Sequence, residues 1–274
     1  MELFYKFLKT LFLGRNKYFN FKYYFLNYGN KMDDVKLTTE GIFIAKDEIQ
    51  IIGASPWHTL VGCKEIFIDG EYDFIDKSNY IMIDIGLNIG ITSLHFAKMS
   101  NIKKVYAYEP FKFTYTQALN NFKLNKVISD KILPNNFGLS NEEGFLEFFY
   151  NKLLPGAMST TRDVFSNNSK LVKEKVLLKD ATQVLKPIFE KHDEKIFVKM
   201  DCEGAEYLIL PNLNKSKLLA NIDVIILEWH KGNPIDLINI LNENNFICFP
   251  EGSFDSELGK IRAIKSSHIK DNEK

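Results

Sequence analysis

The sequence predicts an α/β fold in which a mostly parallel sheet is covered by helices on both faces. From Tyr80 onward, apolar runs of strand length, such as 80–84 and 104–109, alternate with segments that carry apolar residues at helical spacing. Continuous apolar strands that alternate with helices are typical of parallel strands buried on both faces. The chain has 274 residues, 45% of them hydrophobic, which is enough for one large domain with a substantial core.

The expected elements follow one another regularly after residue 80. Strands are expected at residues 80–84, 104–109, 131–137, 195–201, 222–228, 246–250 and 260–265. Helices are expected at residues 90–98, 114–124, 181–191, 205–213 and 234–243. Two further strands, 144–150 and 173–178, interrupt the alternation and predict a β-hairpin inserted after the third strand. The main domain is therefore expected to span residues 80–274.

The N-terminal extension, residues 1–79, has a less regular pattern. Two short apolar runs, 41–45 and 49–53, flank a charged turn and predict a small β-hairpin. Residues 64–68 also have the composition of a strand and precede an Asp-Gly turn. These small elements would form an appendage to the main domain.

The first 31 residues combine an apolar stripe with positive charge. Residues 1–31 carry Lys6, Lys9, Arg15, Lys17, Lys22 and Lys31 against one acid, Glu2. This pattern predicts an amphipathic helix, which could lie on an anionic membrane. A helix packed on the main domain with its lysines in water explains the same pattern, and this is the favoured interpretation.

Composition narrows the class of protein. The formal net charge is zero, so nothing in it favours a nucleic acid partner. The three cysteines are too few and too scattered for a disulfide framework or a zinc site, which favours a reducing compartment. No apolar stretch is long enough to cross a membrane. We expect a cytoplasmic protein, with peripheral contact at the inner face of the membrane as the alternative for residues 1–31.

The ends of the predicted strands carry the residues that suit ligand binding. In open parallel sheets, ligands bind beyond the carboxyl ends of the strands, at the point where the strand order reverses. The first strand leads into a turn with Asp84, Gly86, Asn88 and Gly90. This turn lacks the GxGxxG dinucleotide pattern, and Asp84 would repel a pyrophosphate. An acid among glycines suits a cationic ligand such as S-adenosylmethionine.

The next two strand ends fit the remaining parts of such a ligand. Glu109 ends the second strand, and an acid at that place commonly binds ribose hydroxyls through paired hydrogen bonds. Asn136 and Phe137 follow the third strand and offer an amide and a ring for a purine. Each of these residues alone could serve only to form a turn or cap a helix, but together they indicate a nucleoside site.

The stretches "IDIGLNIGITSLHFA", "VKMDCEGAEYLIL" and "IILEWH" resemble the FkbM-type methyltransferases over roughly residues 64–250. The resemblance implies a seven-stranded, class I methyltransferase Rossmann-like fold that uses S-adenosylmethionine for O-methylation. By matching position, Asp84, Gly86, Asn88 and Gly90 would line the methionine end of the cofactor. Glu109 would hold the ribose, and Asn136 and Phe137 would lie near adenine.

The candidate catalytic residues are Asp201, Glu228 and His230, at the ends of the fourth and fifth strands. Glu203 and Glu206 are expected in the first turn of the following helix, where the helix dipole favours acids. His230 could remove a hydroxyl proton, with Asp201 or Glu228 orienting its ring. Alternatively, the carboxylates could hold Mg²⁺. A histidine is a poor magnesium ligand, so a site without metal is favoured.

The methyl acceptor is less well defined by the sequence. Two expected loops could contact it, one with Trp57 and one with Ser159, Thr160 and Arg162. The family resemblance suggests a hydroxyl of a sugar, glycan or natural product. Two other functions stay open: an NAD-dependent oxidoreductase on a similar sheet, and a non-catalytic membrane-attached protein that kept the methyltransferase fold.

Overall fold

The computed structural model describes residues 25–74, 76–151, 158–159 and 171–267. Contacts divide the chain into two compact units, Met1–Glu71 and Tyr72–Lys274, so the division lies ahead of the expected one at residue 80. The predicted amphipathic helix lies outside the described residues, so membrane contact through it stays a prediction. Among the described helices, none is long and apolar enough to cross a membrane.

Among its described residues, the first unit contains a small antiparallel sheet, helix α3 (Pro56–Phe67) and a short helical segment that ends in the 3-10 helix η1 (Gly29–Lys31). Its strands are β1 (Asp34–Thr38), β2 (Gly41–Lys46) and β3 (Ile49–Gly53), so the predicted hairpin is present and β1 extends it. The strand expected at 64–68 is wrong, because this segment belongs largely to helix α3. Its buried residues Leu60, Cys63 and Ile66 recur at helical spacing, which a five-residue window does not reveal.

The second unit is built around the expected seven-stranded sheet. Its strands are β4 (Tyr80–Ile85), β5 (Ile102–Tyr108), β6 (Ile132–Asn135), β11 (Lys195–Met200), β12 (Val224–His230), β13 (Phe246–Glu251) and β14 (Leu258–Lys265). The order across the sheet is β13-β14-β12-β11-β4-β5-β6. Only β14 runs antiparallel to its neighbours. The predicted class I methyltransferase sheet is therefore confirmed.

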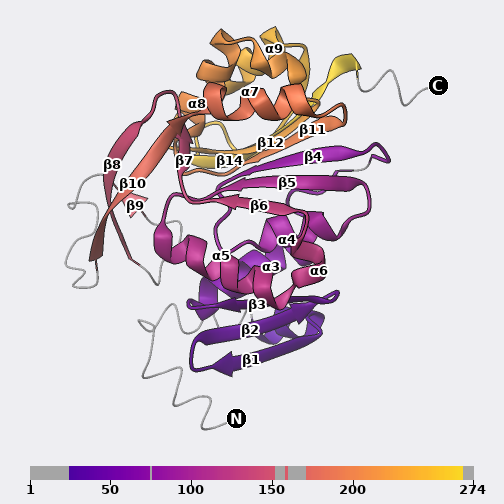
Figure 1. Cartoon of the computed structure of the whole chain (residues 1–274), viewed down its shortest axis with the longest axis vertical. Helices are drawn as coiled ribbons and strands as arrows, with labels where there is room; N and C mark the ends of the chain where they lie inside the picture. The colour runs from indigo at the N-terminus through magenta and orange to yellow at the C-terminus, as the bar shows by residue number, and fades with distance from the viewer. Residues whose placement is uncertain (1–24, 75, 152–157, 160–170, 268–274) are drawn as a thin grey trace. The chain divides into compact units, whose positions relative to one another are not determined.

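Helices cover both faces of this sheet (Figure 1). One layer contains α4 (Ile91–Lys98), α5 (Lys112–Leu124) and α6 (Lys126–Ser129). The other contains α7 (Ala181–Lys191), α8 (Glu206–Lys215) and α9 (Pro234–Glu243). Continuous apolar strands bury both faces, as the buried side chains of Ile226 on one face and of Leu227 and Trp229 on the other illustrate. Trp229 is the largest of them.

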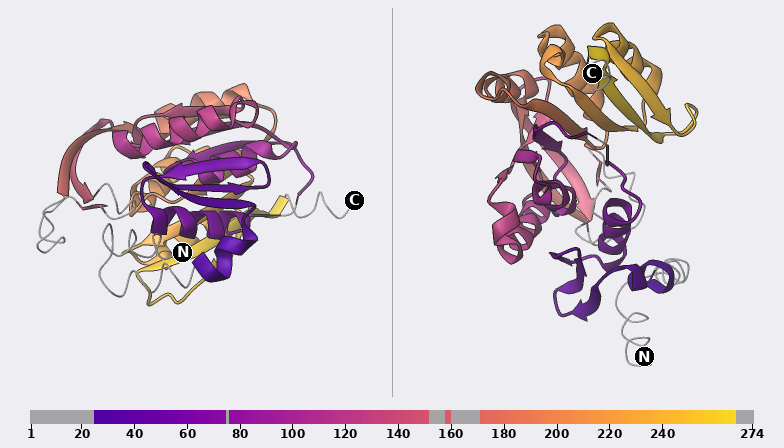
Figure 2. Two further views of the ribbon diagram at one scale, coloured as in Figure 1. Left: turned by 90° about the horizontal axis from the view of Figure 1, so that it is seen from below. Right: turned by 90° about the vertical axis from the view of Figure 1, so that its right-hand side faces the viewer.

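The inserted strands form a separate four-stranded sheet. Its order is β7-β10-β8-β9, with bounds Gly138–Ser140, Leu171–Asp180, Gly144–Asn151 and Met158–Ser159 in that order. Strands β8 and β10 pair antiparallel, which confirms the predicted hairpin. They extend away from the main sheet as a curved ribbon, as Figure 1 and the left view of Figure 2 show.

The sheet order places the functional edge where the sequence predicts it. β4 lies between β11 and β5, and both pairings are parallel. The chain leaves β4 for a helix on one face and leaves β11 for a helix on the other (Figure 1). A crevice opens beyond the carboxyl ends of strands at such a point.

Candidate active site

A cavity of about 230 Å³ lies at the carboxyl ends of β4, β5 and β11. Gly86 and Asn88 line it from the turn after β4, and Glu109 lines it from the end of β5. Asp201 and Glu203 line it from the loop after β11. Apolar side chains of Phe111, which precedes α5, and of the inserted sheet, among them Leu146, Phe148 and Leu178, also line it.

Backbone geometry explains the glycines of the first turn. Gly86 has a φ of 88°, and a Cβ added there would lie 1.8 Å from the carbonyl oxygen of Asp201. Gly90 has a φ of 89° and precedes α4, and a Cβ there would approach the Phe122 ring to 2.7 Å. Gly86 therefore allows the turn to pass close to the cavity, while Gly90 allows close packing of α4 and α5.

Asp84 lies beneath this turn and does not line the cavity. Its side chain is fully buried, and Ser93 Oγ donates a 2.6 Å hydrogen bond to Oδ2. Lys199 Nζ lies 3.3 Å from Oδ1, an ion pair whose geometry is too poor for a hydrogen bond. Burial raises the pKa of Asp84, and Lys199 and Ser93 oppose that rise. The predicted contact of Asp84 with the cofactor therefore stays a prediction.

Lys199, which the sequence reasoning treated as part of an apolar strand, is the central cation of the site. It is 2% exposed, and Nζ donates a 2.6 Å hydrogen bond to the carbonyl oxygen of Gly86. Nζ also lies 3.6 Å from Asp201 Oδ2. Burial lowers its pKa, but Asp84, Asp201 and Glu228 outweigh that effect and raise the pKa above its usual value. A lone lysine inside a buried strand was the signal that could have revealed it.

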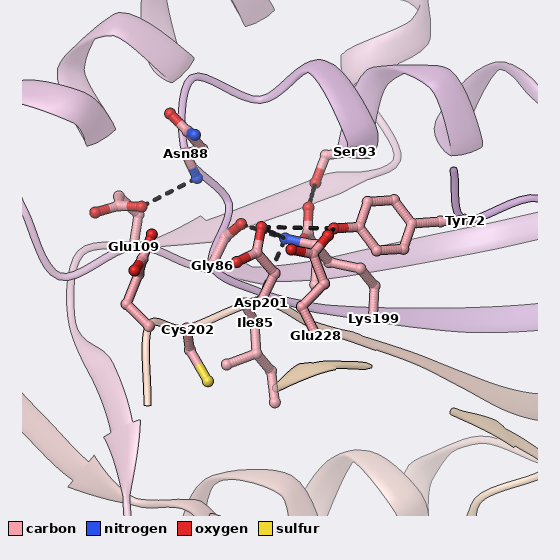
Figure 3. Close-up of polar contacts among 12 residues, drawn as sticks. Tyr72, Ile85, Gly86, Asn88, Ser93, Glu109, Lys199, Asp201, Cys202 and Glu228 are labelled. Atoms are coloured by element: carbon pink, nitrogen blue, oxygen red, sulfur yellow. Dashed lines mark hydrogen bonds and ion pairs between the residues drawn. The ribbon is translucent and has the colours of Figure 1, made fainter. Parts of the chain in front are cut away.

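Glu228 faces Tyr72 at the same edge (Figure 3). The buried Tyr72 hydroxyl donates to Glu228 Oε1 and lies 3.5 Å from Asp201 Oδ2. The Tyr72 ring lies 5.5 Å from Lys199 Nζ and 5.4 Å from Lys260 Nζ, close enough for cation–π contact. Burial and the charge of Asp201 raise the pKa of Glu228. Tyr72 was also missed, because it precedes the regular part of the pattern.

Glu109 is buried at the cavity wall. Its Oε1 accepts a 2.9 Å hydrogen bond from the Phe111 amide, and its Oε2 accepts one of 3.0 Å from the Asn88 amide. Burial raises the pKa of Glu109 to about 8 even though both hydrogen bonds oppose the rise. These contacts hold the carboxylate at the position that the sequence predicts for a ribose ligand.

Asn136 and Phe137 lie behind this wall. Asn136 Nδ2 donates to the carbonyl oxygens of Glu109 and Pro110, at 2.9 and 3.2 Å. The Phe137 ring packs on Tyr108, with the ring centroids 5.4 Å apart. Neither side chain lines the cavity, whereas the next residue, Gly138, does. Their predicted proximity to adenine therefore stays a prediction.

The loop after β11 brings together three acids and His230. Glu206 is fully buried at the first residue of α8, and its Oε1 accepts a 2.6 Å hydrogen bond from the His230 amide. The same oxygen lies 3.2 Å from His230 Nδ1. His230 Nε2 lies 3.8 Å from Asp201 Oδ1 and 3.9 Å from Glu203 Oε2. Glu206 was expected in this helix turn, but Glu203 precedes the helix with a φ of 57°.

Comparison with known proteins identifies the family of this site. Residues 84–248, more than half of the chain, match the family described as the methyltransferase FkbM domain. The chain belongs to the FkbM methyltransferase family. The match includes the turn after β4, the loop after β11 and the end of β12, so it covers the cavity and its acidic side.

Individual relatives agree with this assignment. The chain is 28% identical over 193 residues to "Methyltransferase sdnD" of Sordaria araneosa, covering 61% of this chain and 73% of that one. It is 27% identical over 205 residues to "Methyltransferase 1" of Beauveria bassiana, covering 70% and 74%. The solved FkbM methyltransferase of Methylobacillus flagellatus KT aligns with a TM-score of 0.48 at 14% identity. That alignment covers 73% of this chain and about half, 47%, of the solved chain.

The acidic side of the FkbM site has a distinctive charge pattern. Burial lowers the pKa of His230, but the hydrogen bond and charge of Glu206, with the charges of Glu203 and Asp201, raise it to about 9. Burial raises the pKa of Glu203 to about 7. His230 thus carries its positive charge at neutral pH, where it partly balances the surrounding carboxylates. It becomes a proton acceptor as the pH approaches 9.

The same side chains are close enough to share a cation. Ligand atoms of Asp201, Glu203 and His230 all lie within 4.8 Å of one another. Carboxylate oxygens and an imidazole nitrogen suit several divalent cations. The prediction of a site without metal therefore stays a prediction that chelation can test.

The described residues do not form an acceptor site from the side chains that were predicted to contact the acceptor. Trp57 lies in α3 of the first unit and not in the expected loop, because Pro56 begins the helix. Ser159 lies in β9, and Thr160 and Arg162 lie outside the described residues. Their roles remain predictions.

Proposed function

We propose that this FkbM methyltransferase transfers a methyl group from S-adenosylmethionine to a hydroxyl of a sugar, glycan or other natural product. The observation that carries the proposal is the cavity at the carboxyl ends of β4, β5 and β11. The buried Glu109 lies on one side of it, and Asp201 and Glu203 line the other. His230 does not line the cavity itself, but its Nε2 lies 3.8 Å from Asp201 Oδ1 and 3.9 Å from Glu203 Oε2. This arrangement offers a nucleoside-binding acid at the cavity and a proton acceptor beside its acidic side.

The residues of the cavity fit the cofactor. A carboxylate can accept about four hydrogen bonds, and two of those of Glu109 come from backbone amides. Its remaining capacity suits two ribose hydroxyls, and the apolar walls that include Phe111 and Leu139 suit a purine ring. The volume of about 230 Å³ lies just below the range of about 300–1,000 Å³ typical of small-molecule sites. This size suits a ligand that lies partly in the open crevice.

In the proposed mechanism, the protein aligns the reactants and removes a proton. When bound, S-adenosylmethionine would supply a methyl group on a sulfonium, whose sulfur leaves as the neutral thioether of S-adenosylhomocysteine. The backbone of Gly86 and Asn88 would lie close to the cofactor, and Glu109 would hold its ribose hydroxyls. His230 Nε2 accepts the proton of the acceptor hydroxyl, beside Asp201. Because only the neutral imidazole accepts a proton, the rate is expected to rise with pH up to about 9.

Methyl transfer from radiolabelled S-adenosylmethionine to a panel of sugars, glycans and hydroxylated natural products tests this proposal. His230→Ala is expected to slow transfer by about 10²–10⁴-fold, the usual contribution of a general base. Asp201→Asn is also expected to reduce turnover while binding of S-adenosylhomocysteine survives. His192→Ala is the matched control, because His192 precedes β11 and lies at the opposite end of that strand.

Chelation separates the two catalytic arrangements. Transfer is expected to continue in EDTA if His230 acts without metal. Loss of transfer in EDTA, restored by Mg²⁺, would show that Asp201 and its neighbours serve as metal ligands. Transfer of the label to an amine and not to a hydroxyl would overturn the proposed acceptor class.

A further inference from the structure

The buried carboxylate of Glu206 has contacts that its place in the helix does not explain. An acid at the first turn of a helix is favoured by the helix dipole, and such acids are commonly exposed to water. Glu206 is instead 0% exposed, although it begins α8. A buried carboxylate needs several hydrogen-bond donors to offset its lost hydration. The identity of those donors indicates what the residue does.

The donors come from both strand ends that build the acidic side of the site. Oε1 accepts the 2.6 Å hydrogen bond from the His230 amide and lies 3.2 Å from His230 Nδ1. Oε2 accepts a 2.9 Å hydrogen bond from the Gly204 amide and lies 3.4 Å from Cys202 Sγ. One side chain thus ties the loop that carries Asp201 and Glu203 to the end of β12.

We propose that Glu206 is the positioning residue of this site, which holds the proton of His230 on Nδ1 and leaves Nε2 directed toward Asp201 and Glu203. A neutral imidazole has one N–H group and one acceptor nitrogen, and the partner of one nitrogen decides which is which. An ionised carboxylate only accepts hydrogen bonds, so the nitrogen beside it carries the proton. As a contribution to methyl transfer, this role rests on the proposed function.

The distances at Nε2 agree with an open acceptor position. Asp201 Oδ1 and Glu203 Oε2 lie 3.8 and 3.9 Å from Nε2, which is beyond hydrogen-bond length. Nδ1, in contrast, lies at 3.2 Å from Glu206 and is engaged. From the sequence, Asp201 or Glu228 was expected to orient the His230 ring. In the structure, Asp201 lies beside Nε2 and not Nδ1, and Glu228 accepts a hydrogen bond from Tyr72.

The electrostatics of the pair agree with this geometry. Burial lowers the pKa of His230, and Glu206 is the first of the groups that raise it, followed by Glu203 and Asp201. Glu206 therefore stabilises the imidazolium that forms when His230 accepts a proton. A carboxylate that served only to start α8 would have no such effect on the ring.

Nuclear magnetic resonance of the full chain, labelled with ¹⁵N-histidine and treated with EDTA, tests the proposal without cofactor or acceptor. His230→Asn assigns the His230 signals among those of the five histidines. At about pH 10, above its pKa of about 9, the ring is neutral. The ¹⁵N shifts are expected to show the proton on Nδ1. A proton on Nε2 would overturn the proposal.

A pair of isosteric variants gives the second measurement. Glu206→Gln is expected to lower the pKa of His230 from about 9 toward 6.5, and the pH profile of methyl transfer should move to lower pH with it. Glu203→Gln, the matched control on Nε2, is expected to lower the pKa less and to keep the proton on Nδ1. An unchanged pKa in a folded Glu206→Gln variant would contradict the proposal.

The two proposals can fail separately. If Glu206→Gln does not fold, the position of the proton in the wild-type protein still decides the role of Glu206. If the proton is on Nδ1 but no methyl transfer is found, the proposed function fails and the positioning of His230 stands. If transfer occurs with the proton on Nε2, the reverse holds.

Discussion

The turn after β4 and the loop after β11 both carry an acid at the end of a buried strand, but they use it differently. Asp84 is fully buried against Lys199 and Ser93, and it does not reach the cavity. The Asp201 side chain is 30% exposed and lines the cavity. Both acids lie near the same lysine, at 3.3 and 3.6 Å. Lys199 therefore lies between two acids: Asp84, which is buried and structural, and Asp201, which is accessible to a ligand in the cavity.

The comparison shows what an acid at a strand end indicates. Parallel strands bring their carboxyl ends to one edge, so the sequence locates the edge. It does not show whether a carboxylate turns toward the ligand or inward, because that depends on cations from neighbouring strands. In this protein the cation is Lys199, two residues before Asp201 in the chain and paired across the sheet with Asp84.

The largest expected difference between the two acids is in stability. Asp84→Asn removes a fully buried partner of Lys199, and breaking a buried ion pair typically costs about 3–5 kcal/mol. Asp201→Asn, the matched variant, alters a partly exposed carboxylate and is expected to cost about 1 kcal/mol or less. Urea unfolding of both variants measures the free energies. Equal losses would contradict the distinction between the two acids.

Two cations of the site, His230 and Lys199, should differ in how their contribution to stability depends on pH. The folded-state pKa of His230 is about 9, above the value of about 6.5 expected when unfolded. Its stabilisation is therefore fully present below pH 6.5 and is lost as the pH rises through 9. The loss is at most about 3.4 kcal/mol, since one pKa unit corresponds to 1.36 kcal/mol. The pKa of Lys199 is raised, so this cation stays charged over the same window.

Urea unfolding at pH 6.5 and pH 9.5 measures this effect in the wild-type protein and in His230→Asn. The difference between the two proteins is expected to shrink at the higher pH, while the titrating groups that do not interact with His230 cancel in the subtraction. A difference that is independent of pH would show that His230 does not gain its charge from Glu206 and the neighbouring acids.

A smaller effect is expected at the ribose side of the cavity. Glu109→Gln removes the charge from the hydrogen bonds expected with the ribose, which is worth about 1.5–3 kcal/mol. The affinity for S-adenosylhomocysteine should fall by about 10–150-fold, as measured by calorimetry, without a change in far-UV circular dichroism. Glu147→Gln is the control, because Glu147 pairs with Lys173 on the exposed part of β8. Equal affinity in both variants would remove Glu109 from the site.

The pH dependence of this affinity is the smallest expected effect. Burial raises the pKa of Glu109 to about 8 in the free protein, and ribose hydroxyls need the ionised form as acceptor. Affinity for S-adenosylhomocysteine should therefore fall as the pH drops below about 8, by at most about tenfold per pH unit. Glu109→Gln should bind with no such slope, and a slope that survives in this variant would point to another group.

Much of this arrangement could be predicted from the sequence. Apolar strands with helical stretches between them predicted the sheet, and strand ends predicted Glu109 and Asp201 at the cavity. The roles of Tyr72 and Glu206 could not be predicted in this way, because each depends on a contact between residues far apart in the chain. For Lys199 the only sequence signal was its place inside a buried apolar strand. Glu206 illustrates this limit: its place at a helix start is local, whereas its contact with His230 joins two strand ends.

The local sequence pattern also gave a wrong prediction for one short segment of the first unit. Residues 64–68 have the composition of a strand, but most of them lie in α3 because Leu60, Cys63 and Ile66 form one buried helical stripe. Asp84 was assigned to the cofactor from its neighbouring glycines. Its carboxylate lies buried against Lys199 and Ser93 and does not line the cavity, so this contact stays a prediction.

The central claim is that the cavity beside Glu109 is a nucleoside site for a methyl donor. Calorimetric titration of the full chain with S-adenosylhomocysteine, and of the same sample with NADH, tests it most directly. We expect one S-adenosylhomocysteine to bind per chain, with binding abolished by Gly86→Val, because its Cβ would lie 1.8 Å from the Asp201 carbonyl oxygen. NADH should give no binding. Binding of NADH without binding of S-adenosylhomocysteine would contradict the account and favour an oxidoreductase.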